Sequence, residues 1–418
     1  MISREATADK SPTSASTYWP LVLAFVIGGF SGEKSPLGEA GQWAPLLVLA
    51  AIAMWTVTRG ASYRLDAANR QAVVVGVAIC ASSMIGAFIA SDEASAIYTV
   101  LMLLVWLVIA LMGGRISLDR MLASFALAAI ILVWSFLALS YDDFLVRLQL
   151  SAVGLAPESR YGGPFEIHPN LLGHIMGASA GVMFWYATSV YGLRRWFTIV
   201  SCGVALAMCL AASSRGGLVA STAAVGVTYL LTAIEDRRRR THVVIAIFAI
   251  AGAVLIFVPE TLDALSNMLD LTSKDRGLAD SGLSGRTELW DAAIARFGSI
   301  SAPIVWGGGF RNRWLNENIV DNSYIVILME TGAVGLVLWI GRILQILKRS
   351  ISSIFRAARP VDLAVTSHLL FSLAEGVVNR QLLAIGNPAS LLTIMIVILY
   401  VPIRARSDEA RPIDSQSR

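Results

Sequence analysis

The feature that most constrains this chain is a succession of apolar runs, each about as long as a membrane-crossing helix. About 20 residues of α-helix cross roughly 30 Å of hydrocarbon, and a helix satisfies its backbone polar groups internally, as lipid requires. Hydrophobic residues make up 56% of the 418 residues, charged residues 15%, and the mean hydropathy is +0.66, which excludes an ordinary soluble domain. We predict an all-α, polytopic transmembrane helical bundle. The expected spans, about twelve in all, are residues 17–32, 43–58, 71–90, 95–113, 120–140, 170–190, 196–213, 217–234, 242–259, 322–347, 362–378 and 386–403.

Basic residues predict the orientation of these spans. Arginine or lysine follows every even-numbered run, and loops rich in these residues face the cytoplasm by the positive-inside rule. Both termini are then cytoplasmic, with polar tails at 1–16 and 404–418 on either side of a transmembrane region at 17–403. A count of ten or eleven spans also fits, because the first, second and ninth runs are short or interrupted by glycine.

This orientation places several arginines on the outer face, against the rule that the rest of the chain follows. Arg215 lies in the tight turn "SSRGG" between the seventh and eighth runs, with no acid near it in sequence. Contact with lipid headgroups or pairing with an acid explains any single outer arginine equally well. Several on one face suit a diphosphate ligand, because each guanidinium makes bidentate, charge-assisted bonds. The others are Arg160, Arg286, Arg311, Arg313 and Arg380.

The outer face also carries two long loops, residues 141–169 and 260–321, the second between the ninth and tenth spans. In the second loop, Ser284 or Gly285 is placed to cap a short helix that we expect at the membrane interface. The "GGG" at 307–309 predicts a turn where backbone approaches a ligand closely. The apolar residues at helical spacing on the short helix are Leu289, Trp290, Ala293, Ile294 and Phe297.

The sequence also argues against several kinds of chemistry. It has no paired-acid DxD motif, no Walker loop and no histidines and cysteines at metal-ligand spacing, so we expect no nucleotide-sugar donor, no metal and no cofactor. The net charge of +4 lies mostly in short clusters between apolar runs, and no basic domain is present to bind nucleic acid. Cys80, Cys202 and Cys209 lie inside apolar runs and are predicted to be core residues.

Four groups of short motifs carry a resemblance to a known family. In order they are "RYGGPFEIHPNLLGH" at 160–174, "SSRGGL" at 213–218, "SGRTELWDAA" at 284–293 with "WGGGF" at 306–310, and "DNSYIVILMETGAVGL" at 321–336. Over residues 150–345 the chain resembles the O-antigen ligase and polysaccharide polymerase superfamily. Members are bacterial inner-membrane glycosyltransferases that take a glycan from undecaprenyl diphosphate and join it to an acceptor hydroxyl. The resemblance therefore implies a multi-pass inner-membrane enzyme whose active site faces the periplasm.

The resemblance also implies roles for individual residues. Arg215 and Arg286 match motif arginines that would stabilise the departing diphosphate. Ligases usually have a histidine before the asparagine of the "NSY" motif; this chain has Asp321, which would serve as general base or merely cap the tenth span. His168 is a second candidate base, or a helix-entry residue before Pro169. The residues in or beside the motifs that are expected to bind substrate are Arg160, Asn170, Glu288, Trp290, Asn322 and Arg311.

Two acids lie inside predicted spans, Glu330 in the tenth and Glu375 in the eleventh. Carboxylates within a membrane are costly and are usually paired. We interpret both as structural, with Glu330 either holding the break at "TGAVG" or pairing with an arginine of the site.

The function predicted from these features is polymerisation of undecaprenyl-diphosphate-linked repeat units into surface polysaccharide, either exopolysaccharide or O-antigen. The first alternative is the ligase that moves finished polysaccharide to lipid A core. The second is a transporter of the same lipid-linked sugars, but transport sites tend to lie at the midplane between internal repeats, whereas the distinctive residues here gather at the outer face. The expected partners are the lipid-linked glycan, an acceptor glycan and membrane lipid, with a chain-length regulator and a flippase as neighbours.

Overall fold

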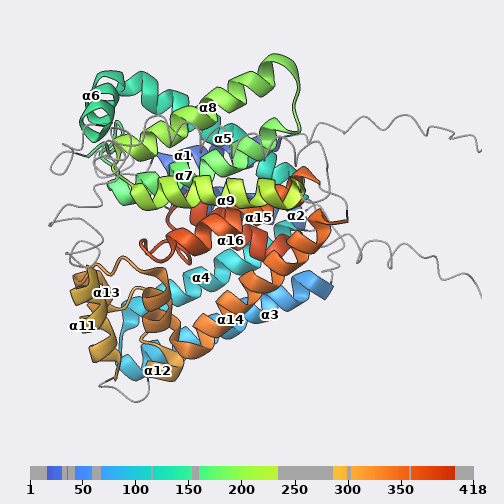
Figure 1. Cartoon of the computed structure of the whole chain (residues 1–418). Helices are drawn as coiled ribbons and strands as arrows, with labels where there is room; N and C mark the ends of the chain where they lie inside the picture. Colours follow the sequence, from blue (N-terminus) through green and yellow to red (C-terminus); the bar gives the residue numbers. More distant parts are fainter. Residues whose placement is uncertain are drawn as a thin grey trace, which may run out of the picture.

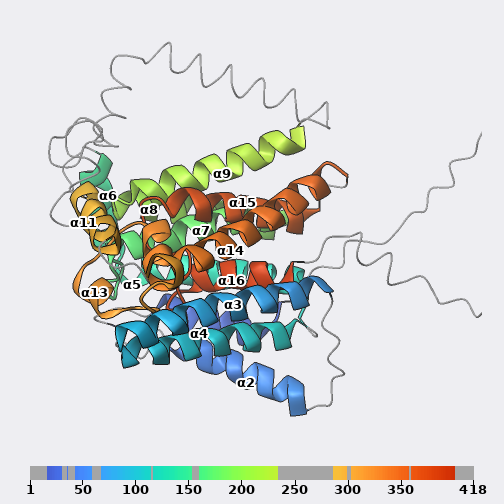
Figure 2. The ribbon, with the colours of Figure 1, turned by 90° about the horizontal axis from the view of Figure 1, so that it is seen from below.

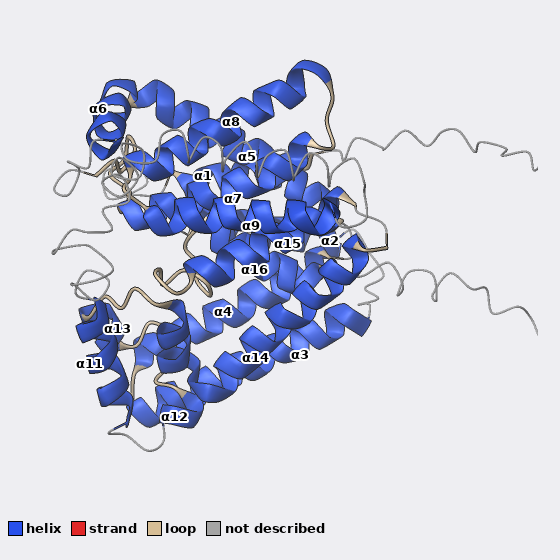
Figure 3. Cartoon of the chain, in the orientation of Figure 1, coloured by secondary structure: helices blue, strands red, loops and turns tan. Residues whose placement is uncertain are grey.

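The computed structural model describes residues 17–30, 35, 43–58, 67–113, 116–152, 160–233, 286–298, 303–356 and 359–400. Within these residues the regular structure is helical, without strands (Figure 3). The helices are α1 (Trp19–Gly29), α2 (Ala44–Thr58), α3 (Ala67–Ala90), α4 (Glu93–Met112), α5 (Leu118–Leu139), α6 (Tyr141–Ala152), α7 (Pro169–Ala187), α8 (Gly192–Ala211), α9 (Arg215–Ala233), α11 (Arg286–Gly298), α12 (Pro303–Trp306), α13 (Arg313–Glu317), α14 (Ser323–Ile354), α15 (Pro360–Glu375) and α16 (Pro388–Leu399).

The helices follow the predicted apolar runs. Each run that falls within the described residues contains a helix, whereas the run at 242–259 and the tails at 1–16 and 404–418 lie outside them. In the described part, α3, α4, α5, α8, α9 and α14 are six helices long and apolar enough to cross a membrane, and α1, α2 and α16 are shorter apolar helices. The structure thus supports an all-helical, multi-pass membrane protein. The count of about twelve spans and the orientation of the termini stay predictions.

Polar caps and prolines determine where several helices begin. The Asp92 side chain accepts a hydrogen bond from the Ser95 N–H at 3.1 Å and caps α4, and the Asn387 side chain accepts from the Ser390 N–H at 2.8 Å and caps α16. Helices α1, α7, α15 and α16 each have a proline in the first turn, where a missing N–H costs nothing.

Helix α7, which begins within the first motif, lies among α5, α8, α9 and α15 and packs against each of them (Figures 1 and 2). Its contact with the start of α9 is very close: a Cβ added at Gly217 would lie 2.7 Å from the Gly173 carbonyl oxygen, and one added at Gly173 would lie 1.9 Å from the Ser214 hydroxyl oxygen. Small residues let membrane helices approach in this way. The start of α9 therefore packs directly against α7 through Gly217.

Helix α14 is broken at Gly332, where φ is 68° and ψ is −176°. The break lies in "TGAVG", as the sequence predicts. The loop after α12 packs into it, because the Gly308 N–H donates to the Met329 carbonyl at 2.7 Å and the Arg311 N–H donates to Glu330 Oε1 at 2.9 Å. Glu330 therefore holds the break, one of the two roles expected of it. The close approach predicted for "GGG" at 307–309 is made to helices of the protein itself.

One end of the bundle gathers α6, α11 and α13 (left in Figures 1 and 2), and we call it the loop end. Helix α6 lies within the stretch 141–169, for which the sequence predicts only a loop. Its first turn carries Asp142 and Asp143, which favour a helix N-terminus, and the Arg147 Nε donates to Asp143 Oδ1 at 3.0 Å one turn on. The three cysteines are free and buried, as predicted.

Candidate functional site

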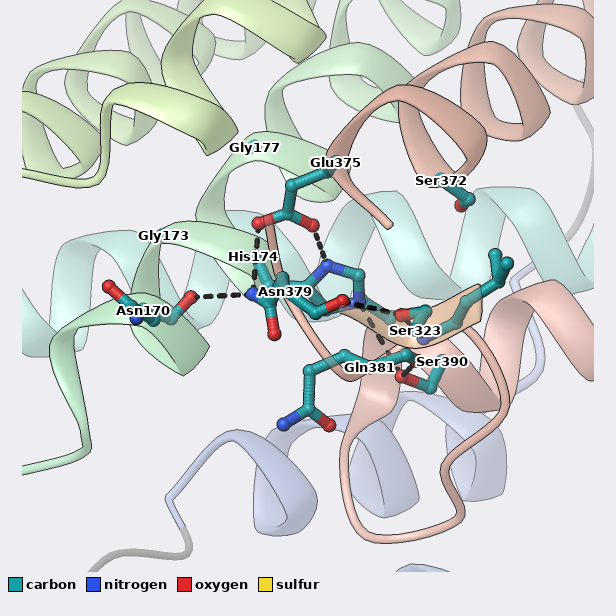
Figure 4. Close-up of polar contacts among 12 residues, drawn as sticks. Asn170, Gly173, His174, Gly177, Ser323, Ser372, Glu375, Asn379, Gln381 and Ser390 are labelled. Atoms are coloured by element: carbon teal, nitrogen blue, oxygen red, sulfur yellow. Dashed lines mark hydrogen bonds and ion pairs between the residues drawn. The ribbon is translucent and has the colours of Figure 1, made fainter. Parts of the chain in front are cut away.

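Four chain segments meet at the loop end, and they bring together residues that are far apart in the sequence. They are the start of α7, the turn between α8 and α9, the start of α14 and the connection that follows α15. Three of the predicted site residues, Arg160, Asn170 and Asp321, form one hydrogen-bonded series across these segments. Figure 4 shows Asn170 and the polar residues beside it.

The Arg160 guanidinium joins two of these segments. Its Nε donates to the Ala212 carbonyl at 2.9 Å, and its Nη2 donates to Asn170 Oδ1 at 2.7 Å and to the Ser213 carbonyl at 3.4 Å. These acceptors are uncharged oxygens, and together the contacts fix the orientation of the planar fork. Arg160 consequently holds the turn from which Arg215 begins α9.

Next to Arg160, Tyr161 is fully buried, and its hydroxyl shares a 2.8 Å hydrogen bond with the Ser140 hydroxyl. Burial raises the pKa of Tyr161 to about 12, and the nearby Asp143 charge acts in the same direction, against the opposing effect of the Ser140 hydrogen bond. Tyr161 is therefore neutral at physiological pH. It anchors the segment before α7 to the end of α5.

Asn170 is also hydrogen-bonded to Asp321, because its Nδ2 donates to Asp321 Oδ2 at 3.2 Å. The cap of α14 is the next residue, Asn322, whose Oδ1 accepts from the N–H groups of Tyr324 at 3.0 Å and Ile325 at 3.1 Å. Asn322 rather than Asp321 thus caps α14, and the side-chain oxygen of this predicted substrate-binding residue is engaged by the helix. Asp321 is half-buried beside this cap. Its role as general base stays a prediction.

Arg215 is the first residue of α9 and is half-buried. The Ser213 and Ser214 N–H groups close the preceding turn by donating to the carbonyls of Leu210 and Cys209 at 2.8 and 2.9 Å. A Cβ added at Gly216 would lie 2.5 Å from a methyl group of Val378. Arg215 therefore starts its helix between α7 and the connection after α15, next to the series that contains Asp321.

The short helix predicted in the outer loop is present as α11, and Arg286 is its first residue. The Arg286 side chain lies outside the described part of the chain. Trp290 is half-buried and packs with the buried Ala293 against α14, whereas Glu288 is exposed. The predicted apolar face is divided, because Leu289 and Ile294 are 39% and 55% exposed.

Two other predicted site residues are Arg311 and His168. The Arg311 guanidinium carbon is 5.1 Å from the centroid of the Tyr98 ring, a cation–π contact on the side of α14 that faces α4. His168 occupies the N-cap position of α7 before Pro169, and its exposed side chain makes no capping bond. His168 thus stands at a helix entry, one of the two roles expected of it.

The structure adds a buried polar cluster beside Asn170 (Figure 4). His174 on α7 contacts Glu375 at the end of α15 through Nδ1 and Oε2, and the two residues are only 2% and 1% exposed. Asn379 Nδ2 donates to Glu375 Oε1 at 3.1 Å and to the Asn170 carbonyl at 3.2 Å. The expectation that Glu375 is paired is confirmed. The spacing of Asn170 and His174 on one helix face is the only sequence signal for this cluster.

The comparisons with known proteins agree with the motifs. Residues 200–340 match the model of a family described as O-antigen ligase. This confirms the resemblance to the O-antigen ligase and polymerase superfamily and covers Arg215, Arg286 and Asp321, while Arg160 and Asn170 precede the matched residues. Comparison with curated proteins gives no match.

Proposed function

We propose that this protein is a glycosyltransferase of the inner membrane that polymerises undecaprenyl-diphosphate-linked repeat units into surface polysaccharide, with its site on the periplasmic side. The family match supports the coarser statement, a membrane role in glycosyl transfer during polysaccharide assembly. The observation that carries the finer one is the series Arg160–Asn170–Asp321 beside the start of α9. It links an acid capable of accepting a proton, through Asn170, to the Arg160 guanidinium and lies beside the helix that Arg215 begins.

In the proposed reaction, Asp321 takes the proton of an acceptor hydroxyl as that oxygen attacks the anomeric carbon of the donor sugar. The bond between this carbon and the diphosphate oxygen breaks, and the electron pair leaves with the lipid diphosphate. Arg215 and Arg286 stabilise the negative charge that develops on this leaving group. The proton on Asp321 then passes to water, which restores the base. Arg160 orients the turn that carries Arg215.

The arginines provide the first test. Because lysine keeps the charge but loses the planar fork, Arg215→Lys and Arg286→Lys should lose nearly as much turnover as the alanine variants, about 100- to 1,000-fold. Arg313→Ala is the matched control: although Arg313 is one of the outer arginines, it is exposed and pairs with Glu317 at 3.0 Å, so we assign it no role at the diphosphate and expect its removal to leave turnover unchanged. Wild-type polysaccharide from both alanine variants would remove these arginines from the mechanism.

The lipid-linked species that accumulates separates the alternatives. A cell with an inactive polymerase retains single repeat units on undecaprenyl diphosphate or singly capped lipid A, and this is the pattern we expect from Arg215→Ala and Asp321→Asn. Long polymer retained on undecaprenyl diphosphate would assign the protein as the ligase instead. Single units protected on the cytoplasmic face would assign it as a transporter.

A further inference from the structure

Asn379 lies between the segment that carries Asn170 and the start of α14. Its side-chain Nδ2 donates to the backbone carbonyl of Asn170, whose own side-chain Nδ2 donates to Asp321 Oδ2. Its own carbonyl accepts a hydrogen bond from the Ser323 hydroxyl at 2.5 Å. Asn379 is 4% exposed. One buried residue therefore contacts both the partner of Asp321 and the helix that starts two residues after Asp321.

The connection that carries Asn379 is itself fixed to the start of α14. The Ser323 N–H donates to the Gly376 carbonyl at 2.8 Å, and the Leu382 N–H donates to the Ser323 hydroxyl oxygen at 3.0 Å. These bonds run in both directions between the same two segments. The backbone on each side of Asn379 is consequently set relative to the first turn of α14.

The buried pair of Glu375 and His174 orients the Asn379 amide. Glu375 Oε1 accepts from Asn379 Nδ2 at 3.1 Å, and its other oxygen contacts His174. Both acceptors, Glu375 Oε1 and the Asn170 carbonyl, are oxygens, so the Nδ2 end of the Asn379 amide must face them. On its far side, His174 Nε2 lies 3.5 Å from the Ser390 hydroxyl, which donates to the Gln381 carbonyl (Figure 4).

We propose that Asn379 is a positioning residue for the reaction, which holds Asn170 and the start of α14 so that Asp321 meets the acceptor hydroxyl, with the Glu375–His174 pair fixing its orientation. The proposal rests on the proposed function, because it assigns the reacting group to Asp321. Asn379 contacts neither donor nor acceptor in this scheme. It acts through Asn170 and Ser323.

This role has a kinetic signature. Misplacing a reacting group by about 1 Å costs up to about 100-fold in rate, and an interaction that matters only in the transition state lowers kcat and kcat/KM equally. In protein reconstituted in nanodiscs with lipid-linked repeat units, Asn379→Ala should lower kcat about 10- to 100-fold and leave KM within about twofold. The control is Ser367→Ala on the same helix α15, since the Ser367 hydroxyl is buried without a partner among the described residues.

A paired substitution distinguishes positioning from a structural role. Glu375→Gln combined with Asn379→Asp exchanges donor and acceptor, so it rebuilds the bond between these two residues and keeps one buried negative charge. It cannot rebuild the bond to the Asn170 carbonyl, because a carboxylate only accepts. We expect the paired variant to melt at a higher temperature than Asn379→Ala, closer to that of the wild type, while its kcat stays low. Recovery of both, or a wild-type kcat in Asn379→Ala, would overturn the proposal.

The same measurements keep the two proposals separable. If the wild-type protein transfers finished polymer to an acceptor instead of joining repeat units, the polymerase assignment fails, and the rate of that transfer serves as kcat for the variants. If Asn379→Ala does not fold, the paired variant decides the question alone, since it retains the hydrogen bond between positions 375 and 379.

Discussion

Replacing Gly332 by alanine should destabilise the protein more than any other glycine substitution in α14. The backbone there has φ of 68° and ψ of −176°, a conformation that essentially only glycine adopts. Forcing another residue into such a region costs about 1–3 kcal/mol. The methyl group would also lie 2.1 Å from the Val305 carbonyl oxygen and 2.5 Å from the Trp306 nitrogen.

These contacts involve backbone atoms, so no side chain is able to rotate away. Either α12 moves outward or the broken helix straightens, and overpacking of this kind adds about 1–3 kcal/mol. The total cost is then about 2–6 kcal/mol. Because the change in melting temperature per kcal/mol falls as chains grow, and is about 2–4 °C for 150–250 residues, we expect a decrease of several degrees for this longer chain.

The three buried cysteines provide the assay, since a thiol-reactive fluorescent dye reports their exposure as purified protein is heated. The matched control is Gly341→Ala in the same helix, where an added methyl group meets nothing within 4 Å. Alanine is a better helix former than glycine by about 1 kcal/mol, so the control should melt at or slightly above the wild-type temperature. If Gly332→Ala and Gly341→Ala melt within about 1 °C of each other, the argument from the break is wrong.

Three further predictions concern orientation, metal and pH. In cells with a permeabilised outer membrane, an impermeant thiol reagent should label a cysteine introduced at Ser299 and should not label one introduced at Ser352. Labelling of the second and not the first would refute cytoplasmic termini. Turnover should be unchanged by a chelator, since arginines are assigned the charge that a metal would otherwise carry; loss restored by magnesium or manganese would contradict this. Burial raises the pKa of Asp92, but hydrogen bonds from Ser95, Arg313 and Ala94 outweigh it and hold the pKa below its usual 3.8. Its stabilising effect is thus present above the usual value and is lost as pH falls through the lower folded value, so Asp92→Asn should reduce the loss of melting temperature between about pH 5 and pH 3; equal losses in both proteins would exclude it.

The sequence predicts the helices of this protein well because lipid allows few alternatives. A run of about 20 apolar residues must satisfy its own backbone, and the described helices accordingly fall on the predicted runs. Helix α6 is not found by this argument, because it is short and amphipathic and therefore contains no long apolar run. The cap of α14 was expected one residue too early, because Asp321 was considered as base or cap, whereas the N-cap is Asn322.

The partners within the site were beyond sequence reasoning. Helical periodicity places Asn170 and His174 on one face of α7, but it does not say that Glu375, 201 positions further on, lies opposite. Nor does it distinguish an acid paired with an arginine from an acid paired with a buried histidine. Asn379 gave no signal at all, since an asparagine just after a span is ordinary in a loop and acquires its importance only from the two helix ends it contacts.

A glycine-rich motif around an arginine serves two purposes in a membrane protein: its glycines pack helices together, and its arginine supplies a charge. Without a hydrophobic driving force between helices in lipid, close approach of small residues supplies much of the contact energy. The glycines of "SSRGGL" meet Gly173 and Val378, and "GGG" at 307–309 meets α14. Such packing fixes the backbone from which the arginine side chain extends, so that its charge is held at one end of the bundle by contacts that are themselves uncharged. The motif therefore joins a packing requirement to a chemical one, which is why its residues stand together in the chain.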